Sequence, residues 1–117
     1  MARILVVEDD IDVGPFVEHI LRASGYAVDL VASHSEAGAR LDANTYDLVL
    51  ADARLPDGSG LDIADAAKAQ GMKTIVMTGF ALSLPAERLQ QHEFMIKPVR
   101  APELVSMISM HLQAGRA

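Results

Sequence analysis

The sequence predicts an α/β domain in which a parallel sheet of five strands carries helices on both faces. Short apolar runs alternate with segments of helical periodicity along the whole chain. This alternation is typical of parallel strands joined by right-handed crossover helices. Half of the 117 residues are hydrophobic and 22% are charged, as in globular proteins. We therefore expect residues 1–117 to form one domain around a shared core.

The composition argues against several classes of protein. No cysteine is present, which excludes disulfides and thiolate metal sites. The formal net charge of −6 argues against a nucleic-acid partner, which requires a basic surface. No apolar run approaches the ~20 residues of a membrane span, and the first strand begins too early to leave space for a signal peptide. We expect a cytoplasmic protein that binds neither membrane nor nucleic acid.

The first strand and helix are the clearest elements. Residues 4–7 are Ile-Leu-Val-Val, a continuous apolar run of the kind that forms a buried parallel strand. Apolar residues then recur at the three- and four-residue spacing of an amphipathic helix, namely Val13, Phe16, Val17, Ile20 and Leu21. Pro15 falls in the first turn of this helix, where its missing N–H costs little, and Gly25 supplies a stop.

A weaker strand is expected over residues 26–31. Asp29 interrupts its apolar pattern, which suits a strand at the edge of a sheet. Ser35 is the expected cap of the second helix, which places Ala37 and Leu41 on its inner face and ends near Asn44.

The third unit contains a buried strand over residues 46–51, and Asp52 follows where this strand gives way to a loop. The loop that follows is rich in glycine and proline, and Asp57 and Gly58 are assigned to a turn within it. Ser59 is the expected cap of the third helix, and Gly71 lies beyond its end.

Two further units complete the pattern. A fourth strand over residues 74–77 ends at Thr78, and a fourth helix is expected to start at Ser83 and to stop before His92. A short fifth strand over residues 94–96 ends at Lys97. The last helix carries Leu104, Val105, Ile108 and Leu112, with Pro102 in its first turn.

Polar side chains follow the strands at their carboxyl ends. They are Glu8, Asp9 and Asp10 after the first strand, Asp52 at the end of the third, Thr78 after the fourth and Lys97 after the fifth. Since parallel strands end at one edge of the sheet, these side chains are expected to converge. Two carboxylates about 4 Å apart repel by roughly 4 kcal/mol at an effective dielectric near 20, so a proton or a cation must lie between them.

Oxygen ligands that leave room for water and phosphate favour Mg²⁺, with Mn²⁺ as an alternative. Zinc is a poor candidate because cysteine is absent and the four histidines show no ligand spacing; we interpret them as structural or surface residues. Asp52 can act as a carboxylate nucleophile, which needs no general base. Lys97 can pair with one phosphoryl oxygen and the hydroxyl of Thr78 can donate to another. The predicted chemistry is phosphoryl transfer.

Taken together, four motifs resemble the receiver domain of bacterial response regulators. They are Glu8-Asp9 after a strand, Asp52 followed by Leu55-Pro56 and Gly60, Thr78, and Lys97-Pro98. The resemblance covers nearly the whole chain and implies a flavodoxin-like, doubly wound fold with strand order 2-1-3-4-5. It implies that a sensor histidine kinase or a histidine phosphotransfer protein donates its phosphoryl group to Asp52. The chain would then be no enzyme toward other substrates, but would catalyse only its own phosphorylation and dephosphorylation.

The same resemblance implies a ligand set for the cation. Asp9, Asp52 and the backbone carbonyl of Arg54 would bind Mg²⁺ directly, and Glu8 would reach it through a water molecule. An unknown output protein would bind the face formed by the fourth helix, the fifth strand and the fifth helix.

It also implies a switch. Thr78 would move toward the phosphoryl group while Phe94 turns inward, and the peptide bond before Pro98 would be cis. We further expect Arg54 and Phe80, two residues past Asp52 and Thr78 respectively, to flank the path of an attacking water and to tune dephosphorylation.

Other interpretations remain open. The chain could be a pseudo-receiver that binds partners without phosphorylation, or the excised receiver domain of a hybrid histidine kinase. A haloacid-dehalogenase-type phosphatase also uses an aspartyl nucleophile, but it places a second acid two residues later, where this chain has Arg54. A nucleotide- or flavin-binding module of the same fold would need glycines after the first strand, which are absent.

Overall fold

The computed structural model of the chain describes residues 1–79, 87 and 90–114. Its central sheet comprises β1 (Arg3–Val7), β2 (Ala27–Val31), β3 (Leu48–Asp52), β6 (Lys73–Thr78) and β7 (Glu93–Ile96). All neighbouring strands are parallel, in the order β2-β1-β3-β6-β7. Counting only the strands of this sheet, the order is 2-1-3-4-5, so the predicted fold and strand order are confirmed.

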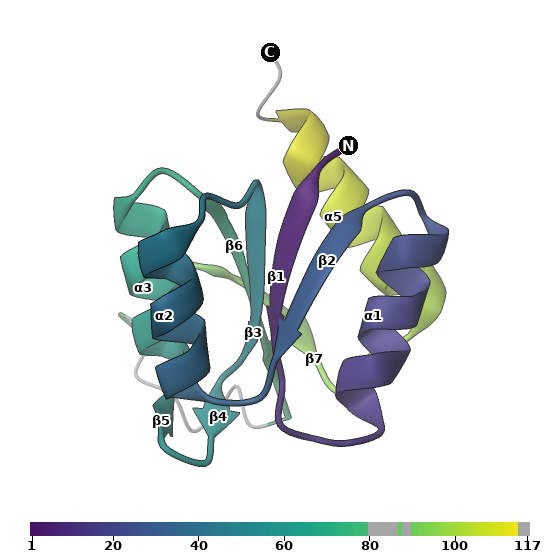
Figure 1. Ribbon diagram of the computed structural model, residues 1–117. Coiled ribbons are helices and arrows are strands. Elements are labelled where there is room, and N and C mark those ends of the chain that lie inside the picture. The colour runs from purple at the N-terminus through teal and green to yellow at the C-terminus, as the bar shows by residue number, and fades with distance from the viewer. Residues whose placement is uncertain (80–86, 88–89, 115–117) are drawn as a thin grey trace.

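Two layers of helices enclose the sheet (Figure 1). One layer contains α1 (Val13–Ala23) and α5 (Ala101–Ala114), and the other contains α2 (His34–Ala43) and α3 (Gly60–Ala69). In the described ranges, no helix combines the length and the apolar character that crossing a bilayer requires. The fourth helix expected from Ser83 onward lies outside the described residues.

The two faces of the sheet carry separate cores, because successive strand residues point to opposite sides. Ile4 and Val6 of β1 pack with the inner residues of α1 and α5. Leu5 and Val7 pack with those of α2 and α3. All four side chains are fully buried, which explains why the first strand reads as an unbroken apolar run.

The expected cap of the second helix was wrong by two residues. Ser33, not Ser35, is the N-cap of α2, and its Oγ accepts the backbone N–H of Glu36 at 3.1 Å. Ser35 lies inside the first turn, where its N–H is bound by the carboxylate of Asp57. The sequence offers two serines at suitable positions, and a contact from a distant loop decides between them.

The loop after Asp52 forms a small antiparallel hairpin that the sequence did not predict. It consists of β4 (Arg54–Leu55) and β5 (Gly58–Ser59). The limits of α3 agree with the prediction: the Ser59 Oγ accepts the N–H of Leu61 at 3.1 Å, and Gly71 follows the helix with a φ of 87°, a conformation that favours glycine. The hairpin therefore leads from the end of β3 directly into the capped start of α3.

Candidate functional site

The strand register brings the predicted polar residues to one edge of the sheet. β1 and β3 align Val7 with Ala51, so the next residues, Glu8 and Asp52, emerge side by side. β7 ends at the same edge, and Lys97 follows directly after it. Elements far apart in the chain therefore deliver two acids and one cation to a common point.

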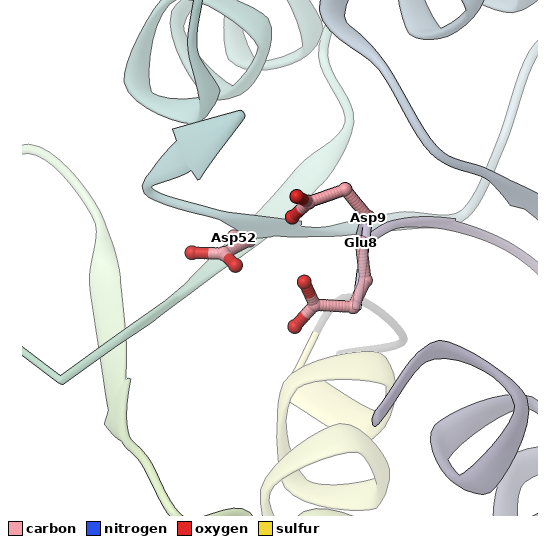
Figure 2. A group of neighbouring side chains, drawn as sticks. All are labelled: Glu8, Asp9 and Asp52. Atoms are coloured by element: carbon pink, nitrogen blue, oxygen red, sulfur yellow. The ribbon is translucent and has the colours of Figure 1, made fainter. Parts of the chain in front are cut away.

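Three carboxylates gather there. One oxygen from each of Glu8, Asp9 and Asp52 lies within 4.8 Å of the others. Figure 2 shows Glu8 and Asp9 leaving adjacent positions and directing their carboxylates toward Asp52. Glu8 and Asp52 are buried, whereas Asp9 is exposed. A cluster of oxygen ligands that is open to solvent on one side suits a small hard cation.

Lys97 pairs with both buried acids. Its Nζ lies 2.6 Å from Glu8 Oε1 and 2.8 Å from Asp52 Oδ2. The Glu8 side chain is wholly buried, and only 12% of the Asp52 side chain is exposed. One ammonium group therefore serves two carboxylates that are largely shielded from water.

Burial and the contacts among these groups shift the pKa values of Glu8 and Lys97. Burial raises the pKa of Glu8 to about 7; the hydrogen bond with Asp52 and its charge add to the rise, and Lys97 opposes it. Burial works against the charged form of Lys97, but the hydrogen bonds to Asp52 and Glu8 outweigh it and raise the pKa of this lysine. Burial beside Asp52 therefore favours the protonated form of Glu8 at pH values below about 7.

The second oxygen of Asp52 is bound by the loop that follows β3. The backbone N–H of Arg54 donates to Asp52 Oδ1 at 3.1 Å. The loop returns so closely that a Cβ at position 60 would overlap the backbone carbonyl of Asp52. Gly60 is therefore required where the start of α3 passes the end of β3.

The remaining predicted residues are placed as follows. Thr78 is buried at the end of β6, and its carbonyl accepts the N–H of Lys97 at 3.0 Å. Phe94 is half-buried and packs against a small apolar cluster of the β3, β6 and α3 region. The Lys97–Pro98 peptide bond is cis. Phe80 lies outside the described residues.

An apolar surface adjoins the acidic cluster. A cavity of about 390 Å³ opens beside Lys97 and is lined by Asp10, Val13, Phe16, Lys97, Pro98 and Val99. Phe16 is 41% exposed, and Ile11, which follows Asp10 in the chain, is 86% exposed. Large apolar side chains next to a polar site provide contact area for a protein surface.

The sequence did not reveal the part that Asp57 plays near the site. The sequence assigned Asp57 only to a turn. In the structure, the Asp57 carboxylate accepts the backbone N–H groups of His34 and Ser35 at 2.7 and 3.0 Å. These partners precede it by 23 and 22 positions, and no periodicity in the chain links them. An aspartate in a turn is ordinary, so only the tertiary structure shows that Asp57 caps the amino terminus of α2.

The model of the response regulator receiver domain family matches residues 4–109. The transcriptional regulatory protein DltR of Streptococcus agalactiae is 30% identical over 92% of this chain and 50% of its own length. The response regulator receiver protein CpdR of Brucella abortus is 30% identical over 98% of this chain and 100% of its own length.

A solved structure of a receiver domain also resembles this chain. A CheY-like receiver domain from Methanospirillum hungatei superposes with a TM-score of 0.87 at 31% identity, covering 99% of this chain and 97% of the other. The chain spans about half the length of several of the curated relatives it matches.

Proposed function

Because this chain belongs to the response regulator receiver family of two-component signalling, we propose that Asp52 is the residue that accepts the phosphoryl group. One observation carries the proposal: the Asp52 carboxylate ends a central strand 2.8 Å from Lys97 Nζ and within 4.8 Å of two further acids. Phosphoryl transfer depends mainly on positioning and on neutralising charge. The groups needed to position the phosphoryl group and to neutralise its charge surround this carboxylate.

Mg²⁺ is the cation that suits these ligands, and Mn²⁺ accepts similar ones. Asp9, Asp52 and the backbone carbonyl of Arg54 would hold it directly, and Glu8 would act through water. The bound cation would offset the repulsion between the acceptor carboxylate and the incoming phosphoryl group. The contact between the Arg54 N–H and Asp52 supports this set, because it keeps the Arg54 backbone beside the acceptor.

The phosphoryl donor is a phosphohistidine of a sensor histidine kinase or of a histidine phosphotransfer protein. A carboxylate oxygen of Asp52 attacks phosphorus, and the imidazole nitrogen leaves with the pair of electrons of the P–N bond. The Lys97 ammonium pairs with a phosphoryl oxygen, and the Thr78 hydroxyl donates to another. The domain then catalyses only its own phosphorylation and dephosphorylation.

Two surfaces are available to partners. The donor protein binds the apolar surface around Phe16 and the 390 Å³ cavity, because that surface adjoins Lys97 and leaves the acceptor within reach. The output partner binds the side of the molecule that carries β7 and α5. There Ile96 is 53% exposed and Met110 is 60% exposed, which supports an apolar contact with a protein partner.

Acetyl phosphate, a small phosphoryl donor, tests the proposal directly. Intact-protein mass spectrometry should show the gain of one phosphoryl group in the presence of Mg²⁺ and none in EDTA. The gain should be absent in Asp52→Asn and retained in Asp42→Asn, which removes the same charge from an exposed position of α2.

Metal-dependent labelling that persists in Asp52→Asn would move the acceptor to another residue. No labelling of the wild-type protein under any condition would favour a binding module that works without phosphorylation.

A further inference from the structure

The amino terminus of α2 is held by a residue from another part of the chain. Asp57 Oδ1 accepts the N–H of His34 at 2.7 Å, and Oδ2 accepts that of Ser35 at 3.0 Å. The third N–H, of Glu36, is bound by the local cap Ser33. The first N–H groups of a helix have no partner within the helix, and in α2 Asp57 binds two of them.

Asp57 lies at the tip of the hairpin formed by β4 and β5, residues 54–59, which begins beside Asp52. At its start, the N–H of Arg54 bonds to Asp52 Oδ1. At its end, the N–H of Gly60 donates to the carbonyl of Ala53 at 3.0 Å. One short segment therefore connects the acidic cluster to the amino terminus of α2.

The 54–59 hairpin has only two residues in each strand and cannot hold its shape alone, because isolated short hairpins are marginally stable in water. Leu55 packs against the core beneath α2. Gly58 is pressed against α2, where an added Cβ would lie 2.8 Å from the ring of His34. The Asp57 carboxylate supplies the polar contact that fixes the hairpin tip to this helix.

We propose that Asp57 is a positioning residue for the phosphoryl site: its bonds to His34 and Ser35 hold the hairpin so that the backbone of Arg54 stays beside Asp52. The proposal rests on the proposed function, because it concerns the Arg54 carbonyl as a ligand of Mg²⁺. Asp57 does not belong to the cluster of Glu8, Asp9 and Asp52, and it acts only through the hairpin.

The expected effect is on metal affinity. Partners that orient the ligands of a metal typically contribute 10- to 100-fold to its binding. Because Asp57 acts through three residues of backbone, we expect Asp57→Ala to weaken Mg²⁺ binding about tenfold, at the lower end of that range. Asp57 is exposed, so the substitution leaves both cores intact.

Two variants make the test specific. Asp57→Asn keeps one oxygen that can accept an N–H and should restore part of the affinity. Ser33→Ala removes the other cap of the same helix, while the bonds of Asp57 to His34 and Ser35 do not involve the Ser33 side chain. Mg²⁺ affinity is measured by isothermal titration calorimetry, and amide hydrogen exchange without metal reports the Arg54 N–H. Exchange at Arg54 should accelerate in Asp57→Ala and remain unchanged in Ser33→Ala.

The outcomes separate this proposal from the proposed function. Affinity that falls in the order wild type, Asp57→Asn, Asp57→Ala, with Ser33→Ala like wild type, supports the positioning role. Equal losses in Asp57→Ala and Ser33→Ala would assign the effect to the stability of α2 and overturn it. Unchanged affinity in Asp57→Ala overturns it and leaves the metal site standing. Failure of the wild-type protein to bind Mg²⁺ would overturn both.

Discussion

The ammonium group of Lys97 lies 2.6 Å from the buried carboxylate of Glu8, although the two residues are 89 positions apart in the chain. The contact joins the loop after the last strand of the sheet to the end of β1. Asp52 shares the same ammonium at 2.8 Å. One positive charge therefore faces two acids, and this imbalance has consequences for stability and for metal binding.

Without a divalent cation, the free energy of unfolding should fall as the pH rises from about 4.5 to about 7. Burial raises the pKa of Glu8 from its usual 4.5 to about 7, so the folded protein keeps a proton here that the unfolded chain releases. Where the folded state binds more protons, stability decreases with pH. The pKa values of Asp10, Asp29 and Asp57 are lowered, so the contributions of these three groups to the free energy of unfolding change at more acidic pH.

Urea denaturation in EDTA at several pH values in this range measures the slope of the free energy of unfolding against pH. Glu8→Gln should flatten it, and saturating Mg²⁺ should flatten it as well, because metal binding requires the deprotonated ligand. A slope that is the same in Glu8→Gln and in the wild-type protein would place the responsible proton elsewhere.

Lys97→Met should tighten Mg²⁺ binding and slow phosphorylation at the same time. The substitution removes the cation that competes with Mg²⁺ for Glu8 and Asp52. It also removes a charge aimed at the phosphoryl oxygens, and loss of one such group costs about 100-fold in rate. Calorimetry gives the affinity, and mass spectrometry with acetyl phosphate gives the rate.

Lys68→Met is the matched control for this experiment. Lys68 lies in the last turn of α3, and its Nζ donates to the carbonyl of Gln91 at 2.6 Å. The two variants have the same net charge, but only Lys97 touches the acids. A similar change of Mg²⁺ affinity in both would show that the overall charge, not the local pair, controls binding.

His92→Leu should lower the free energy of unfolding by about 1–3 kcal/mol, the usual cost of leaving buried polar groups without partners. The His92 side chain is wholly buried; Nδ1 lies 2.8 Å from Thr74 Oγ1, and Nε2 lies 2.7 Å from Asp65 Oδ1. The imidazole thereby links β6 to α3. Urea denaturation gives the change in stability.

Combining His92→Leu with Thr74→Val should recover part of the loss, because the buried hydroxyl is then removed as well. Strictly additive losses in the double variant would contradict the direct coupling of Thr74 and His92.

Gly60→Ala should destabilise the fold by about 3 kcal/mol, the upper part of the usual range for overpacking, and should slow phosphorylation. The new Cβ would overlap the Asp52 carbonyl, and neither backbone segment can move without displacing the acceptor. Gly38→Ala should instead stabilise the protein by about 1 kcal/mol, since Gly38 lies within α2 and its Cβ would enter open space. Thermal denaturation and acetyl phosphate labelling test both. Equal effects of the two substitutions would contradict the close approach at position 60.

The strands and helices were largely predictable, because their signals are local. The run at residues 4–7 is apolar because both faces of β1 are buried. The three- and four-residue spacing in α1 follows the one face that packs on the sheet, except at Phe16, which is exposed. The hairpin of β4 and β5 carries no such signal. Its strands are too short for a period to show, so the sequence indicated only a turn.

The meeting of Glu8, Asp52 and Lys97 could also be predicted from chain order. Parallel strands end at one edge of the sheet, so a polar residue after each strand is brought to that edge whatever the helices between them contain. The sequence could not show that Lys97 bonds both acids, because this depends on the register of β7 and on the path of the chain after it.

The sequence by itself therefore determined the order of the elements, the apolar faces that pack together and the edge at which the acids gather, since periodicity and strand direction are properties of the chain. Only the tertiary structure decided that Ser33 caps α2, that Asp57 crosses over to the same helix, and that His92 is buried between two polar partners. The physical reason is that a polar side chain is satisfied by whichever donor or acceptor the fold places beside it. Those neighbours come from other elements and leave no pattern in the local sequence.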